Sequence, residues 1–267
     1  MKNENKVKVV ILAAGKGTRM MSETPKVLME VNGKPMVKHV IDSVMKSGVT
    51  DRPVVVVGYK KEDVMSELGD TCDFVVQEEQ LGTGHAVMIA QKSIGNTDGQ
   101  ILVLYGDNPF VSPETIKNLA TKNLESGSKI TMGVVKLPDF KDWREFFYSN
   151  FSRVVRDNDG NILKSVEFRD ASEDEKKITE VNPCYYCFDA KWLSEKLATL
   201  KSDNDQEQYY LTDVIKIAMD EKMKIESIDI DPMEALAANS KEELLLLEEF
   251  AVQPGSRALK KSHYRVQ

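Results

Sequence analysis

The chain has 267 residues, of which 41% are hydrophobic and 30% are charged, and its formal net charge is -7. This composition is typical of a globular protein and excludes a disordered chain. No apolar run approaches the roughly 20 residues of a membrane-spanning helix, no signal peptide precedes the first strand, and the negative charge disfavours nucleic acid. We therefore expect a cytoplasmic protein that acts on small molecules, with no nucleic-acid or membrane partner.

Apolar, β-rich runs alternate with amphipathic segments in the first half of the chain. This alternation predicts an α/β fold with a Rossmann-like, mostly parallel sheet and helices on both faces. Ligands bind at the carboxyl ends of the strands in such sheets, so residues that directly follow the runs should converge. The predicted strands are residues 6–13, 54–57, 74–77, 101–105 and 130–137, and the predicted helices are residues 35–47, 61–68, 83–91 and 113–126.

A smaller β-rich part follows residue 137. A turn at residues 157–161 joins two short runs and predicts a hairpin. The charges of the last predicted helix, residues 240–251, are expected to lie on a solvated face. The predicted strands of this part are residues 153–156, 162–168, 179–188 and 225–230, and its helices are residues 190–200, 211–221 and 240–251.

A glycine-rich turn directly follows the first predicted strand. Gly15 and Gly17 allow the backbone to approach an anion and to point N–H groups at it. Lys16, Arg19 and Lys26 can supply the opposing positive charge. An ordinary turn explains the glycines but does not explain three cations, so the segment favours polyphosphate binding.

This turn differs from two better-known phosphate-binding motifs. A P-loop requires Gly-Lys-Ser/Thr, whereas Lys16 is followed by Gly17, and Val10 occupies the position of the first glycine. A dinucleotide-binding fingerprint requires a third glycine where this chain has Met20. Neither motif is therefore supported.

A second glycine-rich loop follows the third predicted strand and begins a helix. Gln77 or Gln80 offers an amide that can donate and accept side by side, as pairing with a pyrimidine edge requires. Gly82 lets the backbone approach a flat ring. A loop in which Thr83 caps the helix is an equally good interpretation, and we expect His85 to be structural.

The fourth predicted strand ends in Tyr105, Gly106 and Asp107. A carboxylate that Gly106 exposes at this end of a strand can ligate Mg²⁺ bound to phosphates. An isolated Asp-Asn-Pro sequence more often forms a turn. The position of Asp107 opposite the cationic turn favours the metal.

These motifs, in this order, resemble those of the sugar-1-phosphate nucleotidyltransferases. The chain is most similar to the uridyltransferase domain of the bifunctional N-acetylglucosamine-1-phosphate uridyltransferases, from Val7 to about Phe250. The matching segments are LAAGKGTRM at residues 12–20, PK at 25–26, QEEQLGTGHA at 77–86, YGD at 105–107, EVN at 180–182, YYLTD at 209–213 and ANS at 238–240.

The resemblance implies a role for each matching residue. Arg19 and Lys26 would be the catalytic cations, and Asp107 and Asn239 would bind Mg²⁺, with Mn²⁺ as a possible substitute. The residues implied to bind the nucleotide are Leu12, Ala13, Ala14, Gly15, Lys16, Gly17, Gln77, Gln80, Gly82, Thr83, Tyr105 and Gly106. Those implied to bind the sugar are Ser152, Glu167, Asn182 and Tyr209.

The resemblance also implies a domain organisation. One nucleotidyltransferase domain would span residues 1–252, with a nucleotide-binding half of about residues 1–137 and a sugar-binding half of about residues 138–252. Residues 253–267 would form a flexible tail. No hexapeptide repeat of the acetyltransferase β-helix type is present, so acetyl transfer is not expected, and the oligomeric state stays open.

The activity that the resemblance implies joins UTP to a sugar 1-phosphate. The acceptor phosphate would attack the α-phosphorus in line, giving a UDP-sugar and pyrophosphate, with N-acetylglucosamine 1-phosphate as the expected acceptor. The alternatives are another sugar 1-phosphate or a phosphorylated alcohol and, in a different class, a non-catalytic sugar-nucleotide-binding regulator. Asp107 and Asn239 together disfavour the regulator.

Two departures from the family pattern lie in the sugar half. Ser152 occupies a position that is usually glycine, and Pro183 and Cys184 follow Asn182 where the family usually has Thr-Gly. Pro183 removes an N–H and Cys184 adds a side chain, so the pocket should differ in shape or polarity. Cys184 and Cys187 lack the further ligands of a zinc site and are expected to be buried thiols.

Overall fold

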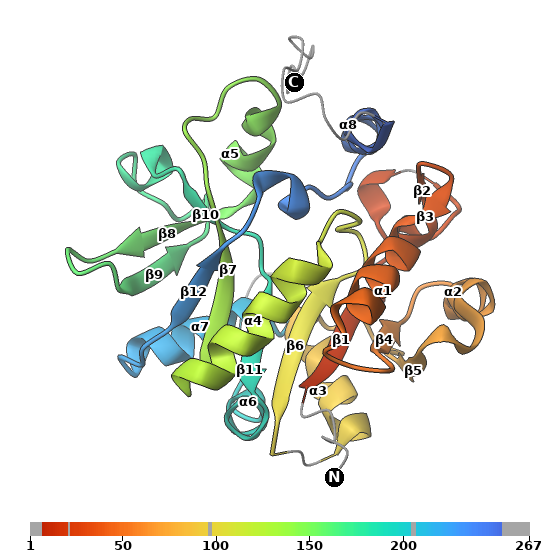
Figure 1. Cartoon of the computed structure of the whole chain (residues 1–267), viewed down its shortest axis with the longest axis horizontal. Coiled ribbons are helices and arrows are strands. Elements are labelled where there is room, and N and C mark those ends of the chain that lie inside the picture. The colour runs from red at the N-terminus through yellow and green to blue at the C-terminus, as the bar shows by residue number, and fades with distance from the viewer. Residues whose placement is uncertain (1–6, 21, 96–97, 204–206, 253–267) are drawn as a thin grey trace.

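The computed structural model describes residues 7–20, 22–95, 98–203 and 207–252. A single mixed sheet crosses the molecule in the order β5-β4-β1-β6-β11-β7-β10-β8-β9, with β12 paired to β7, and β2 and β3 form a separate pair (Figure 1). The predicted tail, residues 253–267, lies outside the described residues. No helix within the described ranges is long and apolar enough to cross a membrane.

The strands are β1 Val7–Ala13, β2 Glu30–Val31, β3 Lys34–Pro35, β4 Val54–Val57, β5 Asp73–Val76, β6 Gln100–Tyr105, β7 Ile130–Lys136, β8 Ser152–Arg156, β9 Ile162–Val166, β10 Glu180–Asn182, β11 Tyr186–Asp189 and β12 Glu226–Asp229. The helices are α1 Met36–Ser47, α2 Lys61–Leu68, α3 Thr83–Ile94, α4 Pro113–Ser126, α5 Phe146–Asn150, α6 Ala190–Leu197, α7 Leu211–Asp220 and α8 Lys241–Val252. Two short 3-10 helices, η2 Lys26–Leu28 and η6 Pro232–Ala235, lie near the candidate site.

The predicted parallel sheet forms the core of the observed one. Strands β5, β4, β1 and β6 pair in parallel. Strand β7 runs in the same direction, but β11 lies between β6 and β7 and is antiparallel to both. Because β11 comes from the second half of the chain, the two halves share one sheet.

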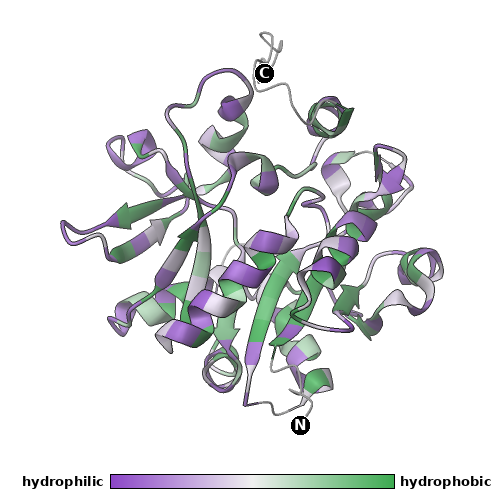
Figure 2. Cartoon of the chain, in the orientation of Figure 1, coloured by the Kyte–Doolittle hydropathy of each residue, from purple (hydrophilic) through white to green (hydrophobic). Residues whose placement is uncertain are grey.

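Strand β1 is buried on both faces, as the middle strand of a helix-covered sheet must be. Val9 and Ile11 pack in a core with α1 and α4, whereas Val10 and Leu12 pack in a second core with α3, α6 and α7. Figure 1 shows α1 and α4 in front of the sheet, and Figure 2 shows the apolar central strands. The prediction of helices on both faces is confirmed.

The predicted strand at residues 179–188 is wrong as a single element. It divides into β10, which pairs with β7 and β8, and β11, which pairs with β6 and β7. The break falls at Pro183 and Cys184, where Pro183 has no N–H to donate and Cys184 adopts a φ of 64°. The predicted hairpin is present as β8 and β9.

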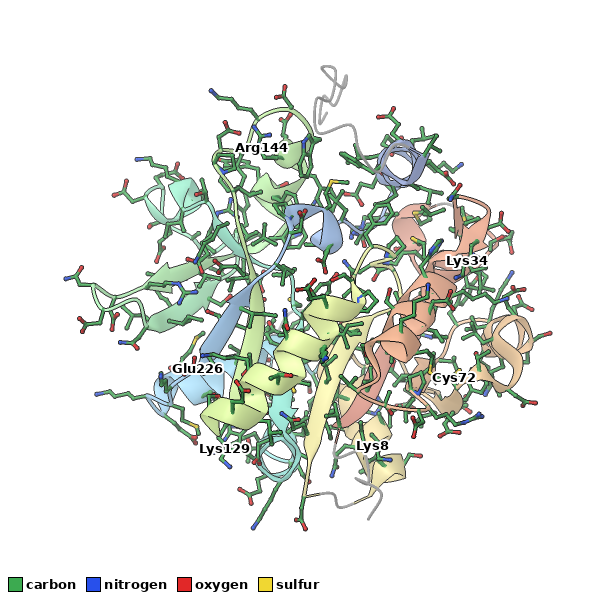
Figure 3. All side chains as sticks on the ribbon, viewed as in Figure 1. Lys8, Lys34, Cys72, Lys129, Arg144 and Glu226 are labelled. Carbon is green, nitrogen blue, oxygen red and sulfur yellow. The ribbon has the colours of Figure 1, made fainter. Side chains whose placement is uncertain are left out.

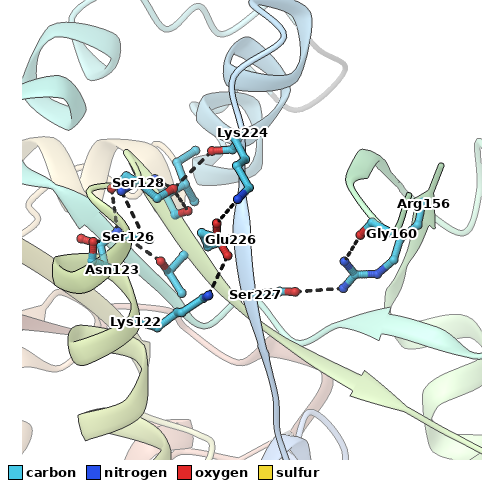
Figure 4. A network of polar contacts seen from close by, with 11 residues as sticks. Lys122, Asn123, Ser126, Ser128, Arg156, Gly160, Lys224, Glu226 and Ser227 are labelled. Atoms are coloured by element: carbon cyan, nitrogen blue, oxygen red, sulfur yellow. Dashed lines mark hydrogen bonds and ion pairs between the residues drawn. The ribbon is translucent and has the colours of Figure 1, made fainter. Parts of the chain in front are cut away.

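Lys34, Lys129 and Arg144, labelled in Figure 3, form ion pairs with Asp42, Asp189 and Asp139. At β12, Glu226 accepts hydrogen bonds from Lys224 at 2.7 Å and from Lys122 of α4 at 2.9 Å (Figure 4). These two bonds lower the pKa of Glu226.

The loop before α3 is hydrogen-bonded to the segment before α7. Gly84 N donates to Tyr209 O at 2.8 Å, and Tyr209 N donates to Leu81 O at the same distance. A Cβ placed on Gly82 would lie 2.5 Å from Tyr209 O, and Gly82 has a φ of 99°. Gly82 is therefore required for this close approach.

Replacing Gly82 with Ala should destabilise the protein more than replacing Gly95 with Ala. Both glycines have positive φ with extended ψ, so both variants carry a similar backbone cost. Nothing lies within 4 Å of a Cβ on Gly95, whereas the Gly82 variant must also displace Tyr209. We expect urea unfolding to give a free energy of unfolding about 2 kcal/mol lower for Gly82→Ala than for Gly95→Ala. Equal losses would contradict the packing argument.

Candidate functional site

The carboxyl ends of the parallel strands meet at one edge of the sheet. Gly106 N donates to Leu12 O at 2.9 Å, and Tyr59 N donates to Ala14 O at 3.1 Å. Next to them, Gln77 N donates to Val57 O at 2.8 Å. The glycine-rich turn, the Gln77 loop and the Asp107 segment therefore follow β1, β5 and β6 at the same edge of the sheet, with β4 between β5 and β1.

Lys26, Asp107 and Asn239 come together at this edge from three distant segments. The Lys26 ammonium donates to the Asp107 carboxylate and, at 2.9 Å, to Asn239 Oδ1. The side chains of Lys26 and Asp107 are 16% and 13% exposed. Partial burial strengthens such charge-assisted hydrogen bonds.

Asp107 and Asn239 form a donor set that suits Mg²⁺. One ammonium contacts both side chains, so their oxygens already converge on a single cation. Mg²⁺ is commonly bound by one or two protein oxygens and completes its coordination with water and substrate phosphates. The described residues contain no group of three or more His, Cys, Asp or Glu side chains that could hold a metal without such help.

The glycine-rich turn presents free backbone donors and two cations. Within the described part of the chain, the N–H groups of residues 15–17 donate no hydrogen bond. A Cβ on Gly15 would meet nothing within 4 Å, whereas one on Gly17 would lie 2.7 Å from Lys26 Cβ. Lys16 and Arg19 are exposed, and Lys16 Nζ lies 5.6 Å from the centre of the Tyr59 ring. The turn can thus receive an anion.

The buried Gln77 side chain orders its own loop. Gln77 Nε2 donates to Gly82 O at 3.0 Å and to His85 Nδ1 at 3.1 Å. Thr83 Oγ1 accepts a hydrogen bond from Leu211 N at 3.0 Å, so it satisfies the first backbone N–H of α7. Gln80 is exposed. The sequence interpretation did not foresee His85 as the partner of Gln77.

Tyr105 is the last residue of β6 and lies near residues of both predicted halves of the site. Burial raises its pKa well above the ordinary value, and the nearby Cys184, Asp107 and Glu167 add to this effect, while a hydrogen bond with Thr83 opposes it. Glu167 itself is exposed just beyond β9. The structure therefore brings Tyr105, Glu167 and Asp107 into one neighbourhood.

Asn182 and Ser152 are buried neighbours on paired strands, and they are 1% and 4% exposed. Asn182 Nδ2 donates to Tyr186 Oη at 2.8 Å and to Ser165 Oγ at 3.2 Å, and its Oδ1 accepts from Cys184 N at 2.8 Å. The amide thus holds the turn that contains Cys184. Direct contact of either residue with a sugar stays a prediction, as does the role of the partly buried Tyr209.

The charges of α8 do not all lie on a solvated face, so that prediction is wrong for Glu243. Its side chain is buried, with the residue only 7% exposed, and its Oε2 accepts from Asn239 N at 2.5 Å. The spacing of Ser240 and Glu243, which fits a helix capping box, is the sequence signal that could have identified it.

With this geometry in place, comparison with known proteins defines the class. Residues 9–213 match the family described as "MobA-like NTP transferase domain". The chain belongs to this family of nucleotidyltransferases.

The relatives share the sequence over most of the chain. Proteins named "Bifunctional protein GlmU" are 46% identical over 78% of this chain in Exiguobacterium sibiricum, 41% over 91% in Alkaliphilus metalliredigens and 37% over 93% in Desulfotalea psychrophila. The alignments cover 44%, 52% and 71% of those proteins. The chain therefore spans about half the length of the first two.

Solved structures share the fold at low sequence identity. A UDP-glucose pyrophosphorylase complexed with UDP-glucose has a TM-score of 0.72 at 16% identity, covering 92% of this chain and 98% of that one. A nucleotidyl transferase from Methanothermobacter thermautotroptrophicus has a TM-score of 0.62 at 18% identity, covering 93% and 99%. The sheet with its parallel core and packed helices is thus a nucleotidyltransferase fold.

The protein should lose stability at alkaline pH because the Cys187 thiol is buried and the Cys184 thiol is shielded from water. Burial raises the pKa of Cys184 to about 12 and also raises the pKa of Cys187 strongly. In the unfolded chain both thiols ionise from about pH 9, so the unfolded state then binds fewer protons and the free energy of unfolding falls as pH rises.

Urea unfolding at several pH values between 7 and 10 measures this effect. Above pH 9 the free energy of unfolding should fall less steeply with pH in Cys187→Ala than in the wild type, because one buried acid is removed. We expect the difference in slope to reach up to about 1.4 kcal/mol per pH unit. Identical slopes in the wild type and the variant would show that Cys187 does not carry the effect.

Proposed function

We propose that the chain is a uridylyltransferase that forms a UDP-sugar and pyrophosphate from UTP and N-acetylglucosamine 1-phosphate. The convergence of Lys26, Asp107 and Asn239 beside the glycine-rich turn carries this proposal. Membership of the nucleotidyltransferase family and 37–46% identity to GlmU proteins support it. The order of the sequence motifs supports UTP and this acceptor.

The reaction needs charge and position more than proton transfer. The acceptor phosphate is already a nucleophile, so it attacks the α-phosphorus in line and pyrophosphate leaves without a general base. Arg19 lies on the exposed turn, and Lys26 lies at the carboxyl edge of the sheet. Both cations offset the repulsion between the two anions and stabilise the developing charge.

Mg²⁺ would be held by Asp107 and Asn239 and would neutralise phosphate charge and orient the leaving group. The Lys26 ammonium is a compact charge on a flexible stem, so it can turn from these oxygens toward a phosphate. Lys26 therefore serves both the organisation of the site and the chemistry.

The hydrogen bonds of Gln77 suggest how the base is selected. Both protons of its amide nitrogen are directed to Gly82 and His85, so its carbonyl oxygen is the group that can meet a base. A carbonyl accepts a hydrogen bond from N3–H of uracil but finds no donor at N3 of cytosine. We therefore propose that Gln77 favours UTP over CTP.

Pyrophosphate release, assayed with UTP or CTP across a panel of sugar 1-phosphates and a phosphorylated alcohol, tests the activity. We expect release with UTP to be fastest with N-acetylglucosamine 1-phosphate. Faster release with another acceptor would reassign the substrate, and equal rates with CTP would contradict the role of Gln77. No release with any acceptor would favour a sugar-nucleotide-binding regulator.

Lys26→Ala and Asp107→Ala should each lower kcat about 100-fold or more, because each removes a charge used in the transition state. Circular dichroism should show that both variants stay folded. Lys38→Ala is a suitable control, since it removes an exposed ion pair with Glu67 on the outer surface and should leave kcat unchanged. Wild-type turnover by either site variant would refute these assignments.

A further inference from the structure

Asn239 lies on a segment with little regular structure of its own. It falls between the short helix η6 and the start of α8, in a stretch without helix or strand. Its side-chain oxygen nevertheless has to reach the Lys26 ammonium, 213 positions away in sequence. Something outside the segment must therefore fix its backbone.

The first part of the segment is held by residues near Asp107. Asn108 Nδ2 donates to Ala235 O at 3.3 Å, Tyr185 Oη donates to Glu234 O at 2.6 Å, and Ser112 N donates to the Glu234 carboxylate at 2.8 Å. Asn108 Nδ2 also donates to Leu236 O at 3.5 Å, so these contacts hold the chain as far as Leu236. They do not reach Asn239.

Glu243 holds the second part. Within the described part of the chain, the bond from Asn239 N to Glu243 Oε2, at 2.5 Å, is the one hydrogen bond that the backbone N–H groups of residues 237–239 donate. The other carboxylate oxygen accepts from Asn150 Nδ2 at 3.3 Å, and Glu243 N donates to Ser240 Oγ at 3.2 Å. A buried carboxylate with both oxygens hydrogen-bonded, on a residue whose backbone N–H is also bonded, has little freedom to move.

We propose that Glu243 is a positioning residue for Asn239: its buried carboxylate fixes the Asn239 backbone and so directs the Asn239 side-chain oxygen to the cation site shared with Asp107. The inference rests on the proposed function, because it assigns Asn239 to the Mg²⁺ and UTP site. Outer residues that orient a metal ligand typically change metal affinity 10–100-fold when they are removed.

Two substitutions separate positioning from packing. Glu243→Gln keeps a carbonyl oxygen that can accept the Asn239 N–H, whereas Glu243→Ala removes it. Glu249→Ala is the matched control, because Glu249 is exposed on the same helix and its side chain makes no hydrogen bond or ion pair with the described residues.

The first measurement is hydrogen exchange at the Asn239 backbone N–H, followed by NMR without substrate. We expect exchange at least about tenfold faster in Glu243→Ala than in the wild type, with Glu243→Gln and Glu249→Ala close to the wild type. Unchanged protection in Glu243→Ala would overturn the inference.

The second measurement is the binding of Mn²⁺ with UTP, followed by water proton relaxation in the absence of acceptor. Glu243→Ala should weaken it about tenfold or more, and Glu243→Gln should restore it. Metal-free UTP, measured by calorimetry in EDTA, should bind all variants alike. In an Asn239→Ala background, Glu243→Ala should cause no further loss of Mn²⁺ affinity.

The outcomes distinguish this inference from the proposed function. Mn²⁺–UTP binding that is equal in the wild type and Glu243→Ala, with only the melting temperature lowered, would overturn the positioning role and leave the proposed function intact. Absence of Mn²⁺–UTP binding in the wild type would overturn both. Additive losses in the double variant would show that Glu243 does not act through Asn239.

Discussion

A single cation, the Lys26 ammonium, joins three parts of the chain that are far apart in sequence. It contacts Asp107 at the end of β6 and Asn239 before α8. The contact is possible because the parallel strands end at one edge and because residues near Asp107 also hold the segment that precedes Asn239. Two anionic substrates could react at this edge only where positive charge is already organised.

Local pattern was sufficient to predict most of the fold. The alternation of apolar runs and amphipathic segments gave β4 and the helices α2 and α4 with the bounds that the structure shows. It could not reveal that β11 inserts between β6 and β7, since strand pairing depends on packing across distant segments rather than on periodicity. The break at Cys184 was missed because its φ of 64° is unusual for a residue with a side chain.

The site was predictable where chemistry and strand ends coincide. Lys26 and Asp107 were chosen from their chemistry and position, whereas Asn239 was implied by the family resemblance, and the structure brings all three together. Internal hydrogen bonding was not predictable in the same way. The Asn182 side chain is hydrogen-bonded to neighbouring residues, and the Glu243 side chain is buried. Both features depend on tertiary contacts that cannot be recognised from the identity of a polar residue. The predicted sugar half is thus the part whose chemistry the sequence defines least.

The most direct test of the central claim is a crystal structure of the protein with UTP and Mn²⁺, in which anomalous scattering locates the metal. We expect an anomalous peak within about 2.5 Å of oxygens of both Asp107 and Asn239, with the Lys26 ammonium moved to a phosphate oxygen. A peak held by other residues, or Lys26 still bonded to Asp107 with UTP bound at another edge of the sheet, would contradict it.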